Sequence, residues 1–482
     1  MPESIAFEIQ QILPDIILSL VGIFILVAGP FVSKAKQSSL GLVGLVGVIA
    51  ASLATANLVG NDGNYFSGMI IVDHFSIFFR FTFLLISGLT ILSSLDYLKR
   101  QNLNLSEYYS LILFATVGMN LMAASNELIM VFLGLETLSI SSYILLGVKR
   151  TDPKSNESAL KYFLLGSFSS AFLLYGIALA YGATKTTNLE FIAKRILSGS
   201  ADMRLIYVAM ALMFVGFGFK VATVPFHVWT PDVYEGAPTP ITAFMSVGPK
   251  AAGFAIFMRV FWVALPTTYE KWVTPIWVSA VLTMTLGNVV AIVQNNIKRM
   301  LAYSSIAHAG YILVAFASGR DDGVAAVLFY TLAYAFMNIG AFTIVALISR
   351  ENERKINLDD YAGIGFRQPL LAASLSLFLL SLAGIPLTAG FAGKFFIFRA
   401  AIESHFIWLA IVGVINSVVS VYYYSRIIVI MYMKESPEEY VPVSISPGTG
   451  LVLCLATFGI LQLGIYPDLL ISLARVSVFN YR

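Results

Sequence analysis

Long apolar segments separated by short polar stretches run along the whole chain. Each apolar segment has about 20 residues, which is the length an α-helix needs to cross the hydrocarbon core of a bilayer. The pattern predicts about fourteen membrane-spanning helices, at 12–33, 40–60, 73–98, 107–124, 126–148, 158–182, 204–229, 237–265, 273–295, 299–318, 323–349, 369–399, 406–433 and 448–470. The predicted fold is an all-α polytopic membrane protein.

Composition supports the membrane assignment. Hydrophobic residues make up 58% of the 482 residues and charged residues only 12%, which is more apolar surface than a soluble core could bury. The N-terminal segment lacks the basic region and the small-residue cleavage site of a signal peptide, so we expect its apolar run to be a retained membrane helix. The formal net charge of +3 is small and spread over short loops, which argues against a nucleic-acid partner.

The single cysteine, Cys454, lies in an apolar stretch without a CxxC companion. A disulfide, an iron–sulfur cluster or a zinc site is therefore not indicated. We expect this chain to carry no cofactor and no metal of its own.

Two apolar segments resemble each other, TVGMNLMAASNELIMVFLGLETLSISSYIL from position 116 and TLGNVVAIVQNNIKRMLAYSSIAHAGYIL from position 285. The matched pairs are Gly118 with Gly287, Asn126 with Asn295 and Tyr143 with Tyr311. Because the segments lie an odd number of spans apart, they would run in opposite directions, as in the inverted repeats of transporters. Chance similarity between apolar sequences is the alternative.

The repeat predicts a division of the chain into four parts. These are helices 1–3 in 1–106, a first five-helix repeat (helices 4–8) in 107–265, an inverted second repeat (helices 9–13) in 266–434, and helix 14 in 435–482.

Two predicted spans contain helix-breaking residues in their middles. Span seven reads VGFGFKVATVPFHVWTPD with Pro225, and span twelve reads SLAGIPLTAGFAGKFF with Gly384 and Pro386. Breaks in a membrane helix are tolerated where protein or water satisfies the freed backbone groups. We therefore expect helices 7 and 12 to be broken around a polar cavity; proline kinks without function are the alternative.

Four charged residues interrupt apolar runs: Glu136, Lys220, Lys250 and Lys394. A charge near the bilayer centre costs roughly 2.5–3.5 kcal/mol, so each needs a partner or water. Movement of protons is the first explanation, and we expect Lys220 to pair with Glu136 because a nearby ammonium keeps a buried carboxylate charged. A static ion pair is the alternative for these two, and a snorkelling side chain for Lys394.

Three further residues are possible relays or modulators. Lys161 lies near the lip of span six, where it could modulate the Glu136–Lys220 pair or simply snorkel to the headgroups. His227, beside Pro225, and His308, in YSSIAHAGY, could relay protons because imidazole titrates near neutral pH. An interhelical hydrogen bond is the alternative for the histidines.

Motifs of known hydrolases, nucleotide-binding loops and metalloproteases are absent from the sequence in any plausible context. Three segments instead resemble a transport family: KVATVPFHVWTPDVYEGAPTPITAFMSVGPKAAGFA, ESALKYFLLGSFSSAFLLYGIALAYGAT and SLAGIPLTAGFAGKFFIF. They are similar to the antiporter-like subunits of respiratory complex I, the NADH-quinone oxidoreductase, a family that includes mitochondrial NADH dehydrogenase subunit 2. The resemblance covers essentially the whole chain, and PDVYEGAPTP together with Lys250 favours the N type over the L and M types.

The resemblance implies a path for protons through this chain. In it, Glu136 and Lys220 form a pair on spans five and seven, Lys250 is the central relay and Lys394 lies on the outlet side. Lys161 and His308 match additional polar positions.

The resemblance also implies partners. Flavin mononucleotide, iron–sulfur clusters and quinone are expected in partner subunits, and the M, K and J subunits are expected as membrane-arm neighbours, surrounded by lipid. A cation/proton antiporter subunit that shares the fold and a purely structural membrane-arm scaffold are the alternatives.

Loop charges predict the orientation. Lys and Arg are more frequent in the loops after odd-numbered spans, among them Lys149, Arg150, Lys298 and Arg299, and such loops tend to stay cytoplasmic. Both termini should then lie on the non-cytoplasmic side of a bacterial plasma membrane or of the inner membrane of an energy-transducing organelle.

Overall fold

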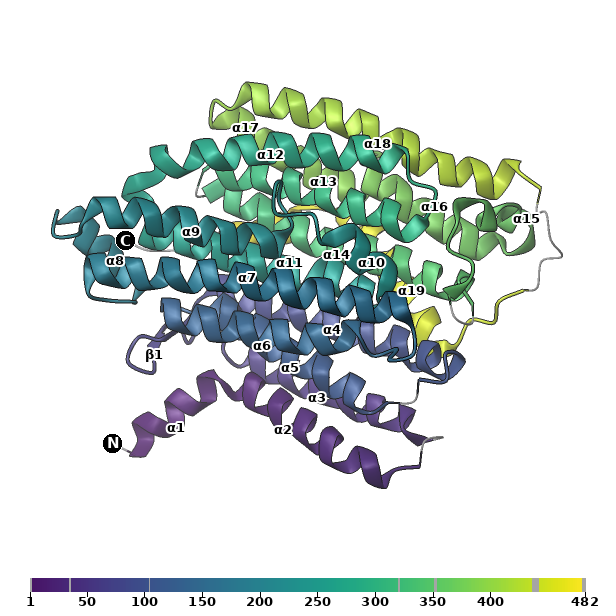
Figure 1. The fold of residues 1–482 in the computed structure, drawn as a ribbon, viewed down its shortest axis with the longest axis horizontal. Helices are drawn as coiled ribbons and strands as arrows, with labels where there is room; N and C mark the ends of the chain where they lie inside the picture. Colours follow the sequence, from purple (N-terminus) through teal and green to yellow (C-terminus); the bar gives the residue numbers. More distant parts are fainter. Residues whose placement is uncertain are drawn as a thin grey trace.

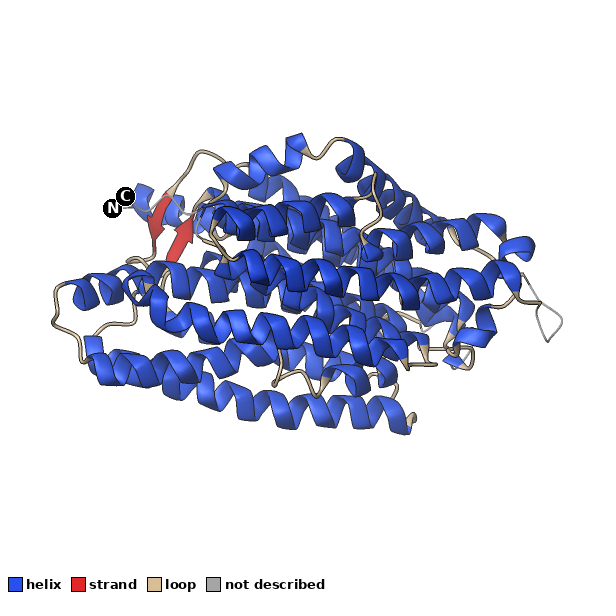
Figure 2. Cartoon of the chain, turned by 90° about the horizontal axis from the view of Figure 1, so that it is seen from above, coloured by secondary structure: helices blue, strands red, loops and turns tan. Residues whose placement is uncertain are grey.

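The helices of the protein lie roughly along one common axis, with both termini at the same end of the bundle (Figure 1). The computed structural model describes residues 2–33, 36–103, 105–319, 321–350, 353–435 and 442–478. We call the end of the bundle opposite the termini, where Lys149, Lys298 and Glu353 lie, the distal end. A view from above shows the small hairpin of strands close to the termini (Figure 2).

The first half of the chain forms an N-terminal group of helices and the helices around the first predicted break. Its elements are α1 (Pro2–Gln11), α2 (Leu13–Ala28), η1 (Gly29–Phe31), α3 (Ser38–Ala56), β1 (Gly63–Tyr65), β2 (Ile70–Val72), α4 (His74–Arg100), α5 (Glu107–Ala124), α6 (Leu128–Leu146), α7 (Pro153–Thr184), α8 (Leu189–Leu197), α9 (Met203–Val221), α10 (Thr230–Gly236), α11 (Thr239–Arg259) and the π-helical turn η3 (Val260–Ala264).

The second half consists of further long helices and short helical turns. Its elements are η4 (Pro266–Thr268), α12 (Tyr269–Ile292), α13 (Ile297–Ala317), α14 (Asp321–Ile348), η6 (Leu358–Tyr361), α15 (Ile364–Arg367), α16 (Pro369–Ala383), α17 (Ala389–Glu403), α18 (Ile407–Met433), α19 (Pro447–Ile465) and α20 (Asp468–Val476).

The polytopic helical fold predicted from the hydrophobic pattern is confirmed. Within the described residues, twelve helices are long and apolar enough to cross a membrane. The other two predicted spans coincide with α5 and with the pair α16–α17, and the count of fourteen stays a prediction. The sequence pattern missed the short helices α1, α8 and α20 and the β1–β2 hairpin, because segments this short carry too few turns or alternations to be recognised.

Three helices occupy the centre of the bundle. α11, α13 and α14 are buried along nearly their whole length, whereas α2, α3, α7 and α18 expose large apolar side chains on their outer faces. Exposed apolar faces of this extent are what a surrounding lipid phase requires. The central helices are therefore the ones shielded on all sides, and two of them carry the buried charges described below.

The two halves of the chain share a close contact between helices at the matched glycines. A Cβ added to Gly118 of α5 would lie 2.7 Å from the carbonyl oxygen of Gly134 on α6, and one added to Gly287 of α12 would lie 2.9 Å from that of Tyr303 on α13. The contacted residues stand the same number of positions after the glycine in both halves. Each glycine lets two helix backbones approach directly, as small residues do in membrane bundles.

A second matched contact joins the first residue of α6, and likewise that of α13, to a loop further along the chain. Leu128 N donates to Thr187 O (2.9 Å) in the first half, and Ile297 N donates to Ile356 O (2.9 Å) in the second. Isolated bridges therefore join residue 127 to 188 and residue 296 to 357. The sequence similarity thus corresponds to equivalent backbone contacts; the opposite orientation of the two halves stays a prediction.

The loop after α14 is fixed to the distal end of the bundle by one carboxylate. Glu353 accepts hydrogen bonds from Tyr97 Oη (2.5 Å), from Thr239 N (2.8 Å) and from Lys298 Nζ (2.9 Å). Lys149 Nζ lies 3.7 Å from the same carboxylate. Burial alone would raise the pKa of Glu353, but the ammonium groups of Lys298 and Lys149, together with the hydrogen bonds, lower it to about 2.

Gly118→Ala should destabilise the protein by about 1–3 kcal/mol, because the added methyl group forces α5 and α6 apart. The measurement is the thermal unfolding midpoint of the full chain in detergent. Gly182→Ala on α7 is the matched control, since nothing lies within 4 Å of its added Cβ. Equal midpoints for the two variants would contradict the close backbone contact.

Glu353→Gln should lower the free energy of unfolding at neutral pH by about 3 kcal/mol, because it leaves buried ammonium groups without their counter-charge. Since the folded-state pKa of Glu353 is depressed from 4.5 to about 2, the stabilisation is complete above about pH 4.5 and is lost as the pH falls towards 2. The difference in unfolding midpoint between wild type and variant should therefore shrink on acidification.

Asp359→Asn is the control for this experiment, because the Asp359 side chain is 78% exposed and pairs with Lys434 at the surface. A pH-independent difference between Glu353→Gln and wild type would rule out the titration as its cause.

Candidate functional site: buried lysines and a hydrogen-bonded chain

Among the described residues five lysines are buried: Lys149 in the loop after α6, and four on the helices of the bundle. Lys220, Lys250 and Lys394 are 3–4% exposed, and Lys298 is completely buried. The sequence singled out the first three, but it treated Lys298 as a charge of a solvated loop, which is wrong. Lys298 lies in the first turn of α13, where the adjoining loop segments cover it.

Lys220 lies in the last turn of α9 and is solvated by two hydroxyl groups. Its Nζ atom donates to Ser139 Oγ of α6 (2.9 Å) and to Tyr162 Oη of α7 (3.0 Å). The C-terminal turn of a helix also favours a cation, because its carbonyl groups point towards it. Protein oxygens therefore replace the water that this ammonium loses on burial.

Glu136 lies one turn before Ser139 on α6 and is half-buried. Its carboxylate accepts a hydrogen bond from Ser170 Oγ of α7 (2.5 Å). Within the described residues, Glu136 and Lys220 do not form the direct ion pair expected from the sequence. Serine hydroxyls on α6 and α7 lie closer to each charge than the charges lie to one another.

A small cavity joins the surroundings of the two charges. It measures about 10 Å³ and is lined by Ser139, Ser169, Ser170 and Lys220, among other residues. This volume is roughly that of one water molecule, and hydroxyl groups supply the polar partners that a buried water needs. Glu136 and Lys220 thus face a common polar space through their serine partners.

The chain between α9 and α10 is not helical, and α12 satisfies its backbone. α9 ends at Val221, and Ala222 has a left-handed conformation (φ 60°). Val224 N donates to Thr283 Oγ1 of α12 (2.9 Å), which also lies 3.0 Å from Thr223 Oγ1. Of the two residues predicted here, Pro225 is exposed and His227 is half-buried in the same stretch.

Lys250 lies in the middle of α11 and reaches α13. Its Nζ atom donates to Ser305 O (2.9 Å) and to Ser305 Oγ (2.5 Å), and it lies 5.8 Å from the centre of the Tyr234 ring. Gly253, one turn further along α11, is adjacent to Lys220, since an added Cβ would lie 3.4 Å from Lys220 Cγ. Lys220 and Lys250 therefore occupy facing parts of α9 and α11.

A separate hydrogen-bonded chain begins at Ser304, the residue before Ser305 on α13. Ser304 Oγ bonds Tyr424 Oη, and Tyr424 Oη lies 3.1 Å from His308 Nε2. His308 Nδ1 lies 2.6 Å from Tyr330 Oη of α14. Hydroxyl and neutral imidazole groups both donate and accept hydrogen bonds, so such a chain can exchange protons along its length. His308 thus bonds tyrosines of two other helices, and its role as a proton relay stays a prediction.

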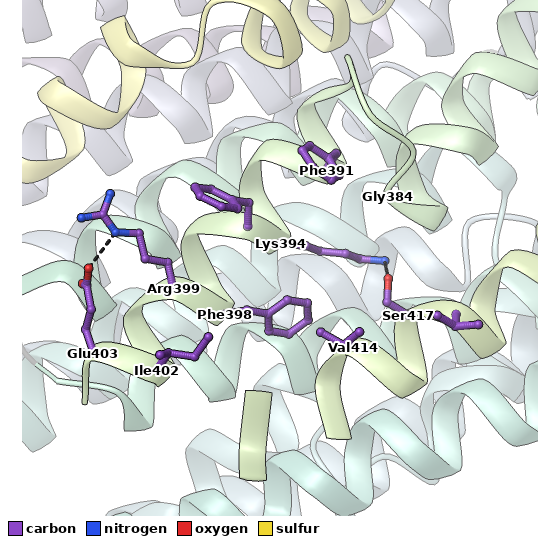
Figure 3. A pocket seen from close by; sticks show the side chains of 11 residues that line it. Gly384, Phe391, Lys394, Phe398, Arg399, Ile402, Glu403, Val414 and Ser417 are labelled. Atoms are coloured by element: carbon purple, nitrogen blue, oxygen red, sulfur yellow. Dashed lines mark hydrogen bonds and ion pairs between the residues drawn. The ribbon is translucent and has the colours of Figure 1, made fainter. Parts of the chain in front are cut away.

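Lys394 lies beside the second interruption, between α16 and α17. α16 ends at Ala383, where Gly384 has a φ of 92°, and Lys394 Nζ donates to Leu382 O (3.0 Å) and Ala383 O (2.9 Å). It also donates to Ser417 Oγ of α18 (2.9 Å; Figure 3). These carbonyls have no partner further along α16 because the helix stops there. The interruption predicted around Gly384 therefore supplies the oxygens that solvate Lys394.

Lys394 lies between the interior and a surface groove. On the inner side, the neighbouring residue Gly393 packs directly against the Tyr330 ring. The centre of the Tyr311 ring lies 4.8 Å from Lys394 Nζ. On the outer side a cavity of about 530 Å³ opens between α17 and α18, beside Gly384 (Figure 3). Pro386 lies in the turn between α16 and α17. Its walls are mainly apolar.

Lys161 does not belong to the group of buried lysines. Its side chain is 39% exposed and pairs with Glu157 (2.6 Å) and with Asp232 of α10 (2.6 Å). Neither Glu136 nor Lys220 is among its partners in the described part of the chain, although its neighbour Tyr162 bonds Lys220. Any influence of Lys161 on those two charges is therefore indirect.

Among the described residues, no group of three or more His, Cys, Asp or Glu side chains is arranged to hold a metal ion. The candidate site consists of ionisable and hydroxyl side chains together with backbone carbonyl groups. The signal that could have found Lys298 is its place in the first turn of a mainly apolar helix. Tyr330 and Tyr424 carry no charge and gave no signal in the sequence.

Comparison with known proteins identifies the family. Residues 125–420 match the family described as NADH:quinone oxidoreductase/Mrp antiporter, transmembrane. The NADH-quinone oxidoreductase subunit N of Trichlorobacter lovleyi is 49% identical over 98% of this chain and 97% of its own length.

Solved structures share the fold. A chain of respiratory complex I from Thermus thermophilus superposes with a TM-score of 0.81 and 32% identity, over 96% of this chain and 99% of its own. A chain of the Mrp complex from Dietzia sp. superposes with a TM-score of 0.83 over 96% of this chain and 97% of its own, but at 22% identity this shows the fold alone. Because the family match spans more than half of the chain and the curated relative matches nearly all of it, the chain belongs to the NADH-quinone oxidoreductase subunit N family.

Proposed function

We propose that this chain translocates protons as a membrane-arm subunit of an NADH:quinone oxidoreductase. One observation carries the proposal: ionisable and hydroxyl groups run through the interior from Glu136 and Lys220, by way of Lys250 and His308, to Lys394. Burying these ionisable groups in a membrane costs free energy, and proton transport through the chain explains why the protein contains them.

In the proposed mechanism, Lys220 alternates between its serine and tyrosine partners and the carboxylate of Glu136. Approach of the carboxylate stabilises the protonated ammonium, and withdrawal favours release of the proton. The proton passes to Lys250, then through Ser305, Ser304, Tyr424, His308 and Tyr330 to Lys394. Lys394 releases it at the outer side of the break after α16.

The energy for this cycle would come from partner subunits. Flavin mononucleotide, iron–sulfur clusters and quinone belong to those subunits in the proposal, and the M, K and J subunits are the expected neighbours. The proposal retains two inverted repeats, at 107–265 and 266–434, and places both termini on the non-cytoplasmic side of a lipid bilayer. In it, Lys161 and His227 modulate the path from its edges.

A cation/proton antiporter subunit is the second candidate, favoured by the shared fold with the Mrp complex chain. The two functions differ in what drives proton movement. Proton uptake that requires quinone reduction supports the first, whereas uptake driven by a sodium gradient without electron flow supports the second.

Lys250→Met and Lys250→Arg should each lower proton pumping by about tenfold or more, because methionine cannot carry a proton and arginine does not release one. Pumping is measured as acidification of inverted membrane vesicles that contain the assembled complex, started by the electron donor. Lys271→Met, at an exposed position in the first turn of α12, is the control and should pump normally. Normal pumping by both Lys250 variants would favour an inert scaffold.

Glu136→Gln should slow coupled quinone reduction and proton pumping together, because the amide cannot stabilise the protonated form of Lys220. We expect a loss of about tenfold. The comparison is with Glu270→Gln, which neutralises an exposed carboxylate on α12. If Glu136→Gln and Glu270→Gln pump equally fast in assembled complexes, Glu136 has no part in the path.

A further inference from the structure

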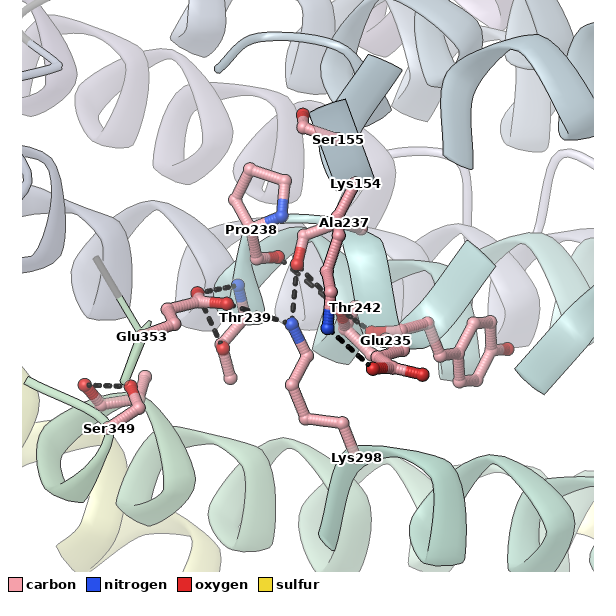
Figure 4. A network of polar contacts seen from close by, with 12 residues as sticks. Lys154, Ser155, Glu235, Ala237, Pro238, Thr239, Thr242, Lys298, Ser349 and Glu353 are labelled. Carbon is pink, nitrogen blue, oxygen red and sulfur yellow. Dashed lines mark hydrogen bonds and ion pairs between the residues drawn. The ribbon is translucent and has the colours of Figure 1, made fainter. Parts of the chain in front are cut away.

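Lys298 is a buried cation with a defined pair of partners at the distal end of the bundle. Its Nζ atom donates to Glu353 Oε2 (2.9 Å) and to Ala237 O (2.6 Å), the residue that links α10 to α11 (Figure 4). The next residue, Arg299, points elsewhere: its side chain is 29% exposed and pairs with Asp232 and Glu235 of α10. Burial therefore distinguishes Lys298 from the surface charges around it.

Lys298 shares a face of α13 with the residue that holds Lys250. Ser305 lies seven positions, or about two helical turns, after Lys298, so the two side chains project from the same side about 10 Å apart along the axis. Ser305 in turn accepts the hydrogen bond from Lys250. Through Ser305 and Lys298, α13 therefore presents polar side chains from the neighbourhood of Lys250 to the distal end.

Polar groups also fill the space between the two lysines on the side of α10 and α11. Ala237 O accepts from Lys298 and lies 3.5 Å from Thr242 Oγ1, which donates to Tyr234 O (3.0 Å). The ring of Tyr234 lies below the ammonium of Lys250. Polar groups of α10 and α11 therefore line part of the interval between Lys298 and Lys250.

Carboxylates near the surface flank the other side of Lys298. The side chain of Glu353 is 10% exposed, and that of Glu235 is 19% exposed where it pairs with Lys154 (2.9 Å). Figure 4 shows both carboxylates around the end of the Lys298 side chain. Because Glu353 remains ionised at physiological pH, it acts as a fixed counter-charge.

We propose that Lys298 is an additional proton-carrying lysine, which takes up protons at the distal end and passes them to Lys250, with Glu353 as the residue that positions it. The inference rests on the proposed function. In the first step the neutral amine of Lys298 forms an N–H bond with a proton delivered by water. In the second step an N–H bond of Lys298 breaks and the proton moves to the neutral amine of Lys250, so charge is conserved throughout.

A static ion pair is the competing interpretation, and arginine separates the two. Arginine keeps the positive charge and can bond Glu353, but it does not release a proton. A structural pair would therefore tolerate Lys298→Arg, whereas a proton carrier would not.

The test compares Lys298→Met, Lys298→Arg and the double variant Lys298→Met/Glu353→Gln in membrane vesicles that contain the assembled complex. Assembly is checked by co-purification with the partner subunits. The double variant removes both members of the Lys298–Glu353 pair, so that among the described residues only Lys149, whose side chain is 10% exposed, loses its counter-charge. Lys434→Met is the matched control, because it breaks the exposed Lys434–Asp359 pair.

We expect Lys298→Arg and the double variant to assemble and to pump protons about tenfold or more slowly than Lys434→Met. Normal pumping by Lys298→Arg, or by the double variant, would overturn the proposal. Lys250→Met is measured alongside: if it abolishes pumping while the Lys298 variants pump normally, only the role of Lys298 fails. If Lys250→Met also pumps normally, the proposed function itself fails.

Discussion

The structure depends on the solvation of ammonium groups inside a bundle of apolar helices. A lysine removed from water must find oxygen atoms elsewhere, and the protein supplies them from hydroxyl side chains and from carbonyl groups at helix ends. Lys394 uses two carbonyls at the end of α16, Lys250 uses both oxygens of Ser305, and Lys220 uses a serine and a tyrosine. The end of α16 is therefore a condition for holding Lys394, whereas Lys220 and Lys250 depend on groups of neighbouring helices.

The need of buried charges for polar partners also determines the structure of the distal end. The loop after α14 brings Glu353 to Lys298 and Lys149, while Tyr97 and Thr239 complete the coordination of the carboxylate. This carboxylate connects α4, α11 and α13, which belong to three different parts of the chain. One buried charge thus fixes the relative positions of helices that share little other polar contact at that end.

Close backbone packing makes these short distances possible. Gly118 and Gly287 let α5 approach α6 and α12 approach α13, and Gly253 lets α11 approach Lys220 on α9. In a lipid environment, packing of this kind replaces the hydrophobic effect as the force that holds helices together. The small residues at the contacts therefore bring the helices close enough for hydroxyl groups to bond the buried charges.

The sequence by itself determined the helical fold, the twelve spans that the described residues confirm, the matched segments at Gly118 and Gly287, and the three lysines Lys220, Lys250 and Lys394. These features depend on the local alternation of apolar and polar residues and on charges within apolar runs, which are visible in the residues alone. Glu136 was also visible, but its partner was not: Ser170, on another helix, takes the place expected for Lys220.

Only the tertiary structure decided which neutral groups complete the site. The tyrosines Tyr330 and Tyr424 resemble other aromatic residues of an apolar helix, and Lys298 resembles a loop charge until the loop after α14 covers it. The physical reason is that hydrogen bonds between helices depend on how the helices pack, and residues far apart in the sequence determine that packing.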